Sequence, residues 1–345
     1  VLTFYFYGKK STIKVTKTLK VVNSMDIMTS LKNQIIGKNI RIVFPEGNEP
    51  RVVQAASLLA RENMLKPILI GSIEEVQAAA GTYSLEGCEI IDPKHYDKLD
   101  EMVTELVAVR KGKVTEEQAR ELVLNVNYFG TMLVHMGLAA GLVSGAIHST
   151  GDTVRPALQI IKTKPGISKT FGYFAMLRGD ERYIFADCAI NPNPSSSDLA
   201  EFAIESARVA RMFDIEPKVA LLSFSTKGSA KTEETKKVTE AMEILNGMEL
   251  DFDYDGELQF DAAFVPAVAK TKVKDSKVAG QANVFVFPDL NSGNIGYKIA
   301  QRLGGFEAVG PILAGLNKPV NDLSRGCSPE DVYGTAIITA NQTLL

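Results

Sequence analysis

The feature that most limits the fold of this 345-residue chain is a regular alternation of short apolar runs with longer amphipathic ones. The short runs are rich in β-branched residues and are typical of strands: 40–46, 66–72, 89–92, 141–147, 218–225, 283–289 and 308–316. Between most of them lie runs with apolar residues three and four apart, such as 50–63, 97–112 and 196–213. Strands that are apolar throughout and alternate with helices form largely parallel sheets covered on both faces. The pattern therefore predicts an α/β protein.

One segment breaks the alternation. Residues 168–177 and 181–190 are both strand-like, and the short polar turn 178–180 that joins them predicts an antiparallel hairpin. The chain is also longer than a single core usually allows, so we expect two domains. The hairpin marks the start of the second, and the final strand and helix could close either one. We predict a first domain of residues 25–163 plus 311–345 and a second of residues 164–310.

The first 24 residues differ in composition from the rest. They carry five lysines and no acidic residue, and an aromatic run precedes the lysines. A signal peptide has the opposite order, with its charges before the apolar core. We expect residues 1–24 to be an added or upstream-translated extension, disordered or accessory, with the natural start at Met25 or Met28. Removing its five positive charges takes the formal net charge from −3 to −8.

Composition argues against several classes of protein. Basic residues are scattered, which does not suit a nucleic-acid-binding face, and no apolar run approaches the roughly 20 residues that span a bilayer. The cysteines are far apart and form no CxxC pair, which favours reduced thiols in a cytoplasmic protein. The three histidines lack the spacing of a metal site. We therefore expect no metal, no nucleic acid and no membrane.

No standard nucleotide-binding fingerprint is present. Two strands instead end in hydroxyl-rich turns that open helices, at 145–158 and 221–234. The first turn carries Ser149, Thr150 and Arg155, and the second carries serines, a threonine and a lysine. Hydroxyls, a cation and helix N-terminal amides together suit an anion, although Ser and Thr at such turns often only cap the helix. The presence of two such turns favours a phosphate-sized ligand.

The segment 321–336 is predicted to be a polar loop that runs into a helix. Its residues Ser328-Pro329-Glu330-Asp331 fit a capping box, with Ser at the N-cap, Pro at N1 and an acid at N3. Arg325 lies before this helix in a Ser-Arg-Gly turn, where a surface arginine has no structural duty. A guanidinium grips a phosphate or carboxylate at two points, so Arg325 is a candidate anion-binding residue.

Several long stretches resemble the phosphate acetyltransferase (phosphotransacetylase) family. The most specific are PVNDLSRGCSPEDV (319–332) and GLVSGAIHSTGDTVRPALQIIKTKPG (141–166), supported by IRIVFPEG (40–47) and FVFPDLNSGNIGYKIAQRLG (285–304). The match runs in order from about residue 30 to the C-terminus. Pro50 departs from the polar residue more usual at that position, but proline is tolerated at a helix start.

The resemblance implies reversible acetyl transfer: acetyl-CoA plus phosphate gives acetyl phosphate plus CoA. It implies two α/β domains with an interdomain cleft, a fold like the isocitrate and isopropylmalate dehydrogenases, and a homodimer. CoA is a substrate here, and no cofactor or metal takes part in the chemical step. The matching positions imply the following roles: Ser324, Arg325 and Asp331 are catalytic, and Arg110, Arg155, Ser149 and Thr150 bind phosphate or CoA.

The implied mechanism is direct attack of the CoA thiolate on acetyl phosphate with Asp331 as general base. An unperturbed carboxylate is roughly 4–5 pKa units too acidic for this step, a cost of roughly 6 kcal/mol. Desolvation of Asp331 and stabilisation of charge by Arg325 would offset it. Cys327 is expected to be a neighbour and not a nucleophile.

Three alternatives stay open. A phosphotransbutyrylase would use the same scaffold for longer acyl chains. A non-catalytic acyl-CoA sensor is disfavoured because Ser324, Arg325 and Asp331 are all present. An oxidoreductase is the weakest alternative, because neither a dinucleotide-binding turn nor an acidic metal cluster is evident.

Overall fold

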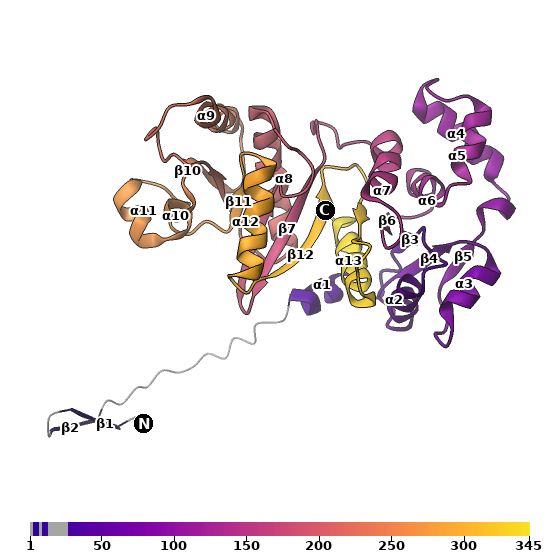
Figure 1. Cartoon of the computed structure of the whole chain (residues 1–345), viewed down its shortest axis with the longest axis horizontal. Coiled ribbons are helices and arrows are strands. Elements are labelled where there is room, and N and C mark those ends of the chain that lie inside the picture. The colour runs from indigo at the N-terminus through magenta and orange to yellow at the C-terminus, as the bar shows by residue number, and fades with distance from the viewer. Residues whose placement is uncertain (1–2, 7–8, 13–26) are drawn as a thin grey trace.

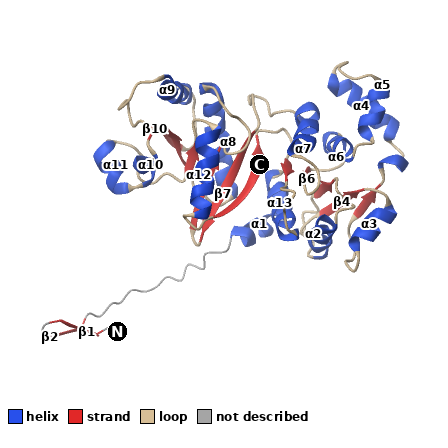
Figure 2. Cartoon of the chain, in the orientation of Figure 1, coloured by secondary structure: helices blue, strands red, loops and turns tan. Residues whose placement is uncertain are grey.

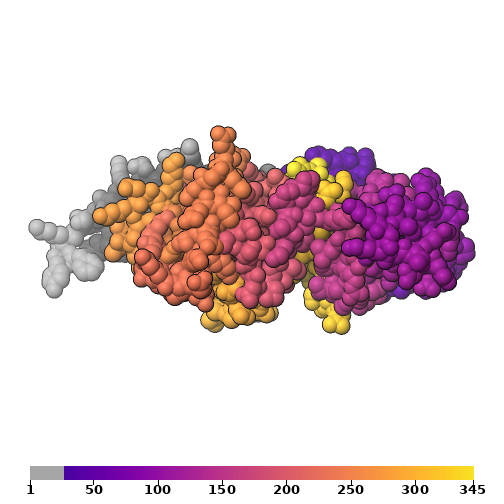
Figure 3. Space-filling model, turned by 90° about the horizontal axis from the view of Figure 1, so that it is seen from above, coloured from indigo at the N-terminus to yellow at the C-terminus, as the bar shows by residue number. Residues whose placement is uncertain are grey.

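A computed structural model of the chain describes residues 3–6, 9–12 and 27–345, and it contains two α/β halves that lie side by side along its long axis (Figure 1, Figure 3). The predicted α/β class is confirmed. β1 (Thr3–Phe6) and β2 (Lys9–Thr12) form a small antiparallel ladder of their own. The rest of the predicted N-terminal extension lies outside the described residues.

The first half is built on a five-stranded sheet with the order β13-β6-β3-β4-β5, in which every pair is parallel. Its strands are β3 (Arg41–Phe44), β4 (Lys66–Ile70), β5 (Glu89–Ile91), β6 (Gly141–Ser144) and β13 (Val320–Asp322). Its helices are α1 (Ile27–Ile35), α2 (Pro50–Arg61), α3 (Ile73–Ala80), η1 (Pro93–His95), α4 (Leu99–Arg110), α5 (Glu116–Val123), α6 (Val126–His135), α7 (Thr150–Pro156), η2 (Ala157–Ile161) and α13 (Pro329–Gln342).

Both faces of this sheet are covered, as strands that are apolar throughout require. On β3, Ile42 and Phe44 pack into one core with α1, α2 and α13, whereas Val43 points to the opposite core with α4, α5 and α6. Figure 2 shows these helices around the sheet. The strand is therefore buried on both sides because its side chains alternate between two helical layers.

The second half has a six-stranded sheet with the order β10-β9-β11-β8-β7-β12. Its strands are β7 (Phe171–Arg178), β8 (Glu181–Ala186), β9 (Lys218–Leu222), β10 (Asp253–Leu258), β11 (Val284–Val286) and β12 (Glu307–Ala314). Its helices are α8 (Ser196–Met212), α9 (Glu233–Asn246), α10 (Phe260–Phe264), α11 (Pro266–Lys272) and α12 (Leu290–Arg302). β7 and β8 form the predicted antiparallel hairpin, which is thereby confirmed, and β12 pairs antiparallel with β7.

The chain crosses between the two sheets twice, at residues 162–166 and 314–320, which we call the hinge segments. They are held together by backbone hydrogen bonds: Lys164 N–H donates to the Gly315 carbonyl and Asn317 N–H to the Lys162 carbonyl, both at 2.9 Å. β12, in the second sheet, runs to Ala314, and β13 in the first begins at Val320. The predicted domain limits at residues 163 and 311 stay predictions.

Residues 320–322 correct the sequence prediction of a polar loop. They form β13, a buried edge strand of the first sheet, because their polar side chains find partners inside the protein. Asn321 accepts a hydrogen bond from Leu313 N–H (2.8 Å) and donates to Thr339 Oγ1 (2.8 Å) and Gln342 Oε1 (2.7 Å). Leu313 belongs to β12, so this amide side chain also ties the two sheets together.

In the described part of the chain, none of the helices is both long and apolar enough to cross a membrane. The three cysteines are unpaired.

Candidate active site

Three loops meet at one edge of the first sheet, because β13, β6 and β3 are parallel neighbours and end on the same side. They are residues 45–49 after β3, 145–149 after β6 and 323–328 after β13. In open α/β sheets this edge, at the carboxyl ends of the strands, is where ligands usually bind. The predicted residues Ser149, Thr150, Ser324 and Arg325 all lie here.

Glu46 shapes the loop that follows β6. Its carboxylate is buried and accepts backbone N–H hydrogen bonds from Gly145, Ala146, Ile147 and His148, at 2.8–3.0 Å, as well as one from His148 Nδ1 at 2.8 Å. Burial alone would raise the pKa of Glu46, but these hydrogen bonds outweigh it and lower the pKa below its ordinary value. The loop after β6 is therefore wrapped around a carboxylate whose ionised form these hydrogen bonds favour.

Arg51, in the first turn of α2, connects the loops. Its Nη1 donates to the carbonyls of Arg325 and Cys327, both at 2.9 Å, and its Nη2 donates to the Ala146 carbonyl at 3.0 Å. Its Nε donates to Glu49 Oε1 at 2.7 Å, which fixes the guanidinium plane. The backbone around Arg325 is thus held against the loop after β6.

The segment after β13 has the predicted capping box. Ser328 is the N-cap of α13, its Oγ accepts from Asp331 N–H (3.2 Å), and Asp331 Oδ2 accepts from Ser328 N–H (2.8 Å). Pro329 occupies the first helical position. The carboxylate of Asp331 is exposed, so the cap leaves its other oxygen open to a ligand.

Ser324 and Arg325 are both exposed beside this helix. The Ser324 hydroxyl accepts a hydrogen bond from Gly326 N–H at 3.2 Å. Within the part of the chain that the structure describes, the Arg325 guanidinium forms no ion pair, although its backbone carbonyl is held by Arg51. An anchored backbone with an unpaired cation suits the capture of an anion.

α7 starts at the same edge. Ser149 is its N-cap, in a capping box with Asp152, and donates to Asp152 Oδ2 at 2.7 Å. Arg155 is exposed one turn later and folds back over the start of the helix, where its Nη2 lies 3.6 Å from the position a Cβ would take on Gly151. Arg155 and the first amides of α7 therefore face the same region.

Thr150 connects this helix to β13. Its Oγ1 donates to Asp322 Oδ2 at 2.6 Å, and Asp322 is buried at the end of the strand. Burial raises the pKa of Asp322 above its ordinary value. Thr150 is an exposed residue whose hydroxyl is bonded to a buried carboxyl.

Two other predicted features belong to other elements. Arg110 ends α4, which packs on η2, and its Nε is buried with no hydrogen-bond partner among the described residues. In the second hydroxyl-rich turn, Lys227 contacts the Asp255 carboxylate and the Gly256 carbonyl, and Ser225 donates to buried Glu257. The polar side chains of that turn therefore bond to other residues of the second half.

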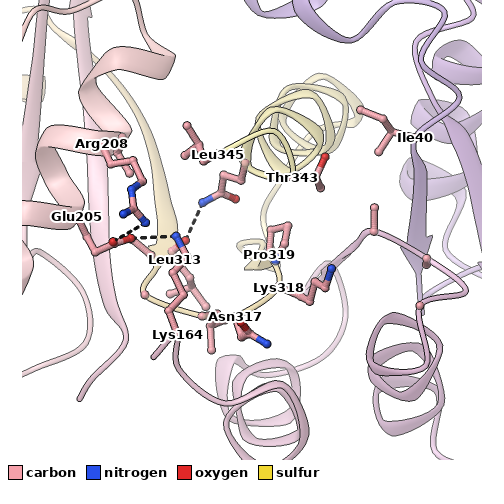
Figure 4. Close-up of a pocket in the computed structure, with 18 of the residues that line it drawn as sticks. Ile40, Lys164, Glu205, Arg208, Leu313, Asn317, Lys318, Pro319, Thr343 and Leu345 are labelled. Atoms are coloured by element: carbon pink, nitrogen blue, oxygen red, sulfur yellow. Dashed lines mark hydrogen bonds and ion pairs between the residues drawn. The ribbon is translucent and has the colours of Figure 1, made fainter. Parts of the chain in front are cut away.

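A cavity of about 780 Å³ lies at the opposite edge of the first sheet. It is lined by the starts of β3 and β6, by both hinge segments and by α8. Figure 4 shows Glu205 and Arg208 of α8 on one side, Ile40 on the other, and Lys318 and Pro319 between them. Lys164 donates to Glu205 Oε2 at 3.0 Å and Arg208 to Glu205 Oε1 at 2.9 Å, so the α8 side of the cavity is internally paired.

Sequence reasoning missed Glu46, Arg51 and Asp322. Glu46 and Arg51 bond to backbone atoms of the loops, and Asp322 bonds to the side chain of Thr150. No local sequence motif marks such contacts. The one available signal was for Glu46, an acidic residue just after the apolar run that ends in Phe44 and Pro45. Among the residues described, no group of three or more His, Cys, Asp and Glu side chains could hold a metal ion.

Comparisons with known proteins agree on one family. Residues 26–340 match the family described as phosphate acetyl/butaryl transferase. A protein of Bacillus subtilis (strain 168) named phosphate acetyltransferase is 61% identical over 321 residues, covering 92% of this chain and 99% of its relative. The crystal structure of a phosphotransacetylase from Streptococcus pyogenes has a TM-score of 0.90 and 60% identity, over 92% of this chain and 98% of the other.

A more distant likeness concerns the fold alone. A putative 4-hydroxythreonine-4-phosphate dehydrogenase from Salmonella typhimurium has a TM-score of 0.51 and 15% identity, over 88% of this chain and 99% of the other. The predicted dehydrogenase-like architecture is consistent with it.

The pairing of His148 with Glu46 predicts a pH-dependent contribution to stability. The hydrogen bond to Glu46 raises the pKa of His148 above its ordinary value near 6.5. Its contribution is therefore fully present below about pH 6.5 and is lost as the pH rises through the raised pKa. His148→Gln should lower the free energy of unfolding in urea by about 1–2 kcal/mol at pH 5.5 and by less at pH 9.

The matched control is His95→Gln, because His95 pairs with Asp92 on the surface and its side chain is 83% exposed. That variant should differ little from the wild type at either pH. A deficit in His148→Gln that is the same at both pH values would contradict the charged pairing.

Proposed function

Because the chain belongs to the phosphate acetyl/butaryl transferase family, we propose that this acyltransferase is a phosphate acetyltransferase. It exchanges an acetyl group between CoA and phosphate: acetyl-CoA plus phosphate gives acetyl phosphate plus CoA. CoA is a substrate in this reaction and no cofactor is needed. The observation that carries the proposal is the anchoring of Arg325, an exposed cation, against the loop that leads to the start of α7.

The phosphate group is held between α7 and the segment after β13. Arg325 and Arg155 supply two guanidinium groups, and the first amides of α7 supply neutral donors, with Thr150 beside them at the start of the helix. Helix N-terminal amides and guanidinium groups both favour phosphate. Ser149 shapes this subsite as the N-cap, and Arg110 binds a phosphate of CoA farther from the reacting carbon.

Acetyl transfer follows from direct attack. Asp331 takes the proton of the CoA thiol, because thiolate is the nucleophilic form. The sulfur then attacks the carbonyl carbon of acetyl phosphate. Ser324 donates a hydrogen bond to the carbonyl oxygen as negative charge develops there, and Arg325 stabilises the same charge. The capping box supports this assignment, since it fixes one oxygen of Asp331 on the Ser328 N–H, at the end of the loop that carries Ser324 and Arg325.

No covalent acetyl-enzyme is needed. Cys327 is close to Arg325 in sequence, but its side chain is buried, and burial raises the pKa of its thiol. Its Sγ lies 3.9 Å from Arg51 Nη1, so it packs under the loop. A buried, protonated thiol is a poor nucleophile.

The chain acts as a homodimer in the cytoplasm. The exposed face of α12 supports the dimer: Ile295, Ile299 and Leu303 are 56%, 53% and 86% exposed and recur every four residues, which gives one apolar stripe. Such a stripe on both copies can pack against itself about a twofold axis. The unpaired cysteines support a reducing compartment.

Arg325→Ala should lower the rate of thioester formation from acetyl phosphate and CoA by about 10²-fold or more, because it removes a charge that binds phosphate and stabilises the transition state. The control is Arg120→Ala, since Arg120 makes only surface ion pairs with Asp100 and Glu116. Thioester absorbance measures both. Full activity of Arg325→Ala would overturn the site assignment, and a wild type that prefers butyryl phosphate would change the substrate.

Cys327→Ala should keep substantial activity, within about tenfold of the wild type. Intact-protein mass spectrometry of the wild type mixed with acetyl phosphate alone should find no acetyl adduct on Cys327. An inactive but folded Cys327→Ala variant, or a stable adduct at that residue, would refute direct transfer.

Leu303→Glu should weaken the dimer, because it puts a charge on the most exposed residue of the apolar stripe. Light scattering after size-exclusion chromatography should then detect monomers at micromolar protein concentrations. Ile73→Glu is the matched control, since Ile73 is 54% exposed on α3 and should leave the dimer intact. A Leu303→Glu variant with the wild-type mass would place the interface elsewhere.

A further inference from the structure

The cavity of about 780 Å³ beside the hinge segments, which we call the hinge cavity, is not used by the mechanism above. It lies at the edge of the first sheet opposite the proposed catalytic loops. Its lining joins the starts of β3 and β6 to both hinge segments, to α8 and to the end of α13. Pockets of roughly 300–1,000 Å³ hold small-molecule ligands in proteins. The hinge cavity is therefore large enough for an organic molecule that contacts both halves.

Four cationic side chains line the hinge cavity, and each comes from a different part of the chain. Arg41 begins β3 in the first half, Arg208 lies on α8 in the second half, and Lys164 and Lys318 lie on the two hinge segments. Glu205 is the one acidic side chain among the described residues of the lining. The lining thus carries more positive than negative charge, and the positive charge is spread over both halves.

Glu205 fixes two of these cations in place. Its side chain is 4% exposed, and its oxygens accept hydrogen bonds from Lys164 Nζ at 3.0 Å and Arg208 Nη1 at 2.9 Å (Figure 4). The two cations stay accessible, with side chains that are 28% and 44% exposed. Because each of the three groups carries a single charge, this wall of the cavity has one positive charge in excess.

Lys318 supplies a second excess charge. It is exposed on the second hinge segment, and within the part of the chain that the structure describes it forms no ion pair. Figure 4 shows it between the α8 wall and Ile40. Arg41 adds no net charge, since its Nη2 is paired with Glu89 at 2.5 Å. Two uncompensated positive charges at separate places suit a ligand with two or more negative charges.

The rest of the lining indicates the kind of anion. The apolar side chains of Ile40, Val209, Leu316 and Pro319 suit a carbon skeleton, and the Asn317 amide offers a neutral donor. None of the described lining residues is aromatic, so a nucleotide base would have no ring to stack on. No helix begins among them either, so the N-terminal amides that commonly hold phosphate lie elsewhere. The lining therefore favours carboxylate groups on an aliphatic chain.

We propose that the hinge cavity binds a small aliphatic polycarboxylate, which bridges the two halves and slows acetyl transfer. Its charged contacts are Lys318 on one side and Lys164 and Arg208 on the other. Because these cations lie on the second half and on both hinge segments, a bound polyanion restrains the movement of one half against the other. Turnover in many enzymes is limited by such domain movements. The binding stands on its own, whereas the inhibition rests on the proposed function.

Isothermal titration of the full-length protein with citrate, at a fixed ionic strength, tests the binding. Citrate carries several carboxylates on a short carbon chain, and a ligand of its size should bind with a Kd of about 1 mM or lower. Lys318→Ala should weaken this binding by about tenfold or more, because it removes an uncompensated charge. A wild-type Kd above about 10 mM would overturn the site.

Glu205→Gln should have the opposite effect. It releases Lys164 and Arg208 from their carboxylate, so the cavity gains positive charge and citrate should bind about threefold more tightly or better. Lys66→Ala is the matched control, since Lys66 is an exposed lysine at the start of β4, on the same edge of the sheet but outside the lining. Its Kd should stay within about twofold of the wild type. If Glu205→Gln fails to unfold cooperatively in urea, Lys318→Ala decides alone.

Two further titrations identify the anion and its place. Sulfate and AMP should each bind the wild type about tenfold more weakly than citrate, and equal binding would overturn the choice of a polycarboxylate. Arg325→Ala should keep the wild-type Kd for citrate, because the loop of Arg325 lies at the opposite edge of the sheet. Citrate binding that is lost in Arg325→Ala and kept in Lys318→Ala would belong to the proposed phosphate subsite and would overturn the hinge cavity.

The rate of thioester formation from acetyl phosphate and CoA tests the inhibition. Saturating citrate should lower the wild-type kcat by about threefold or more, and excess acetyl phosphate should not restore it. Lys318→Ala should lose this response and keep wild-type activity in the absence of citrate. A citrate-bound enzyme with unchanged kcat, or inhibition that excess acetyl phosphate relieves, would overturn the inhibition. A wild type with no acetyl-transfer activity would refute the proposed function instead, since the titrations would still decide whether the cavity binds citrate.

Discussion

The site depends on one buried charge. Glu46 accepts the backbone N–H groups of four consecutive residues, which otherwise would be stranded in a turn between a strand and a helix. An ionised carboxylate can satisfy that many donors, and the donors in turn keep it ionised. The start of α7, with Thr150 and Arg155, follows directly from this turn. The α7 side of the proposed phosphate subsite is therefore positioned by Glu46, and the Arg325 side by Arg51.

A second polar side chain links the site to the architecture. Asn321 holds β12 of the second sheet to β13 and α13 of the first, and Asp322, Ser324 and Arg325 follow it within four residues. The same short strand therefore connects the two halves and supports the loop that carries the proposed catalytic residues. Buried amide networks of this kind favour a single packing of the two halves, because any other packing would break hydrogen bonds and leave buried polar groups unsatisfied.

The sequence predicted the fold class, the β7–β8 hairpin and the capping box at Ser328 because each has a local pattern of periodicity, turn or cap. It missed β13, since two of its three residues are polar and local polarity indicates a loop. The strand is buried only because partners far along the chain, Leu313, Thr339 and Thr150, meet those side chains. Arg51 and Glu46 were missed for the same reason. Contacts between a side chain and distant backbone atoms leave no spacing to recognise.

The cavity lies at the edge of the first sheet opposite the proposed catalytic loops, and both hinge segments line it. Because both hinge segments line the cavity, a rotation of one half against the other about them would change the volume of the cavity. The volume of the cavity lined by Lys318 and Arg208 thus depends on the angle between the two halves. Hydrostatic pressure, which penalises voids, would bias the angle between the halves toward whichever position makes that space smaller.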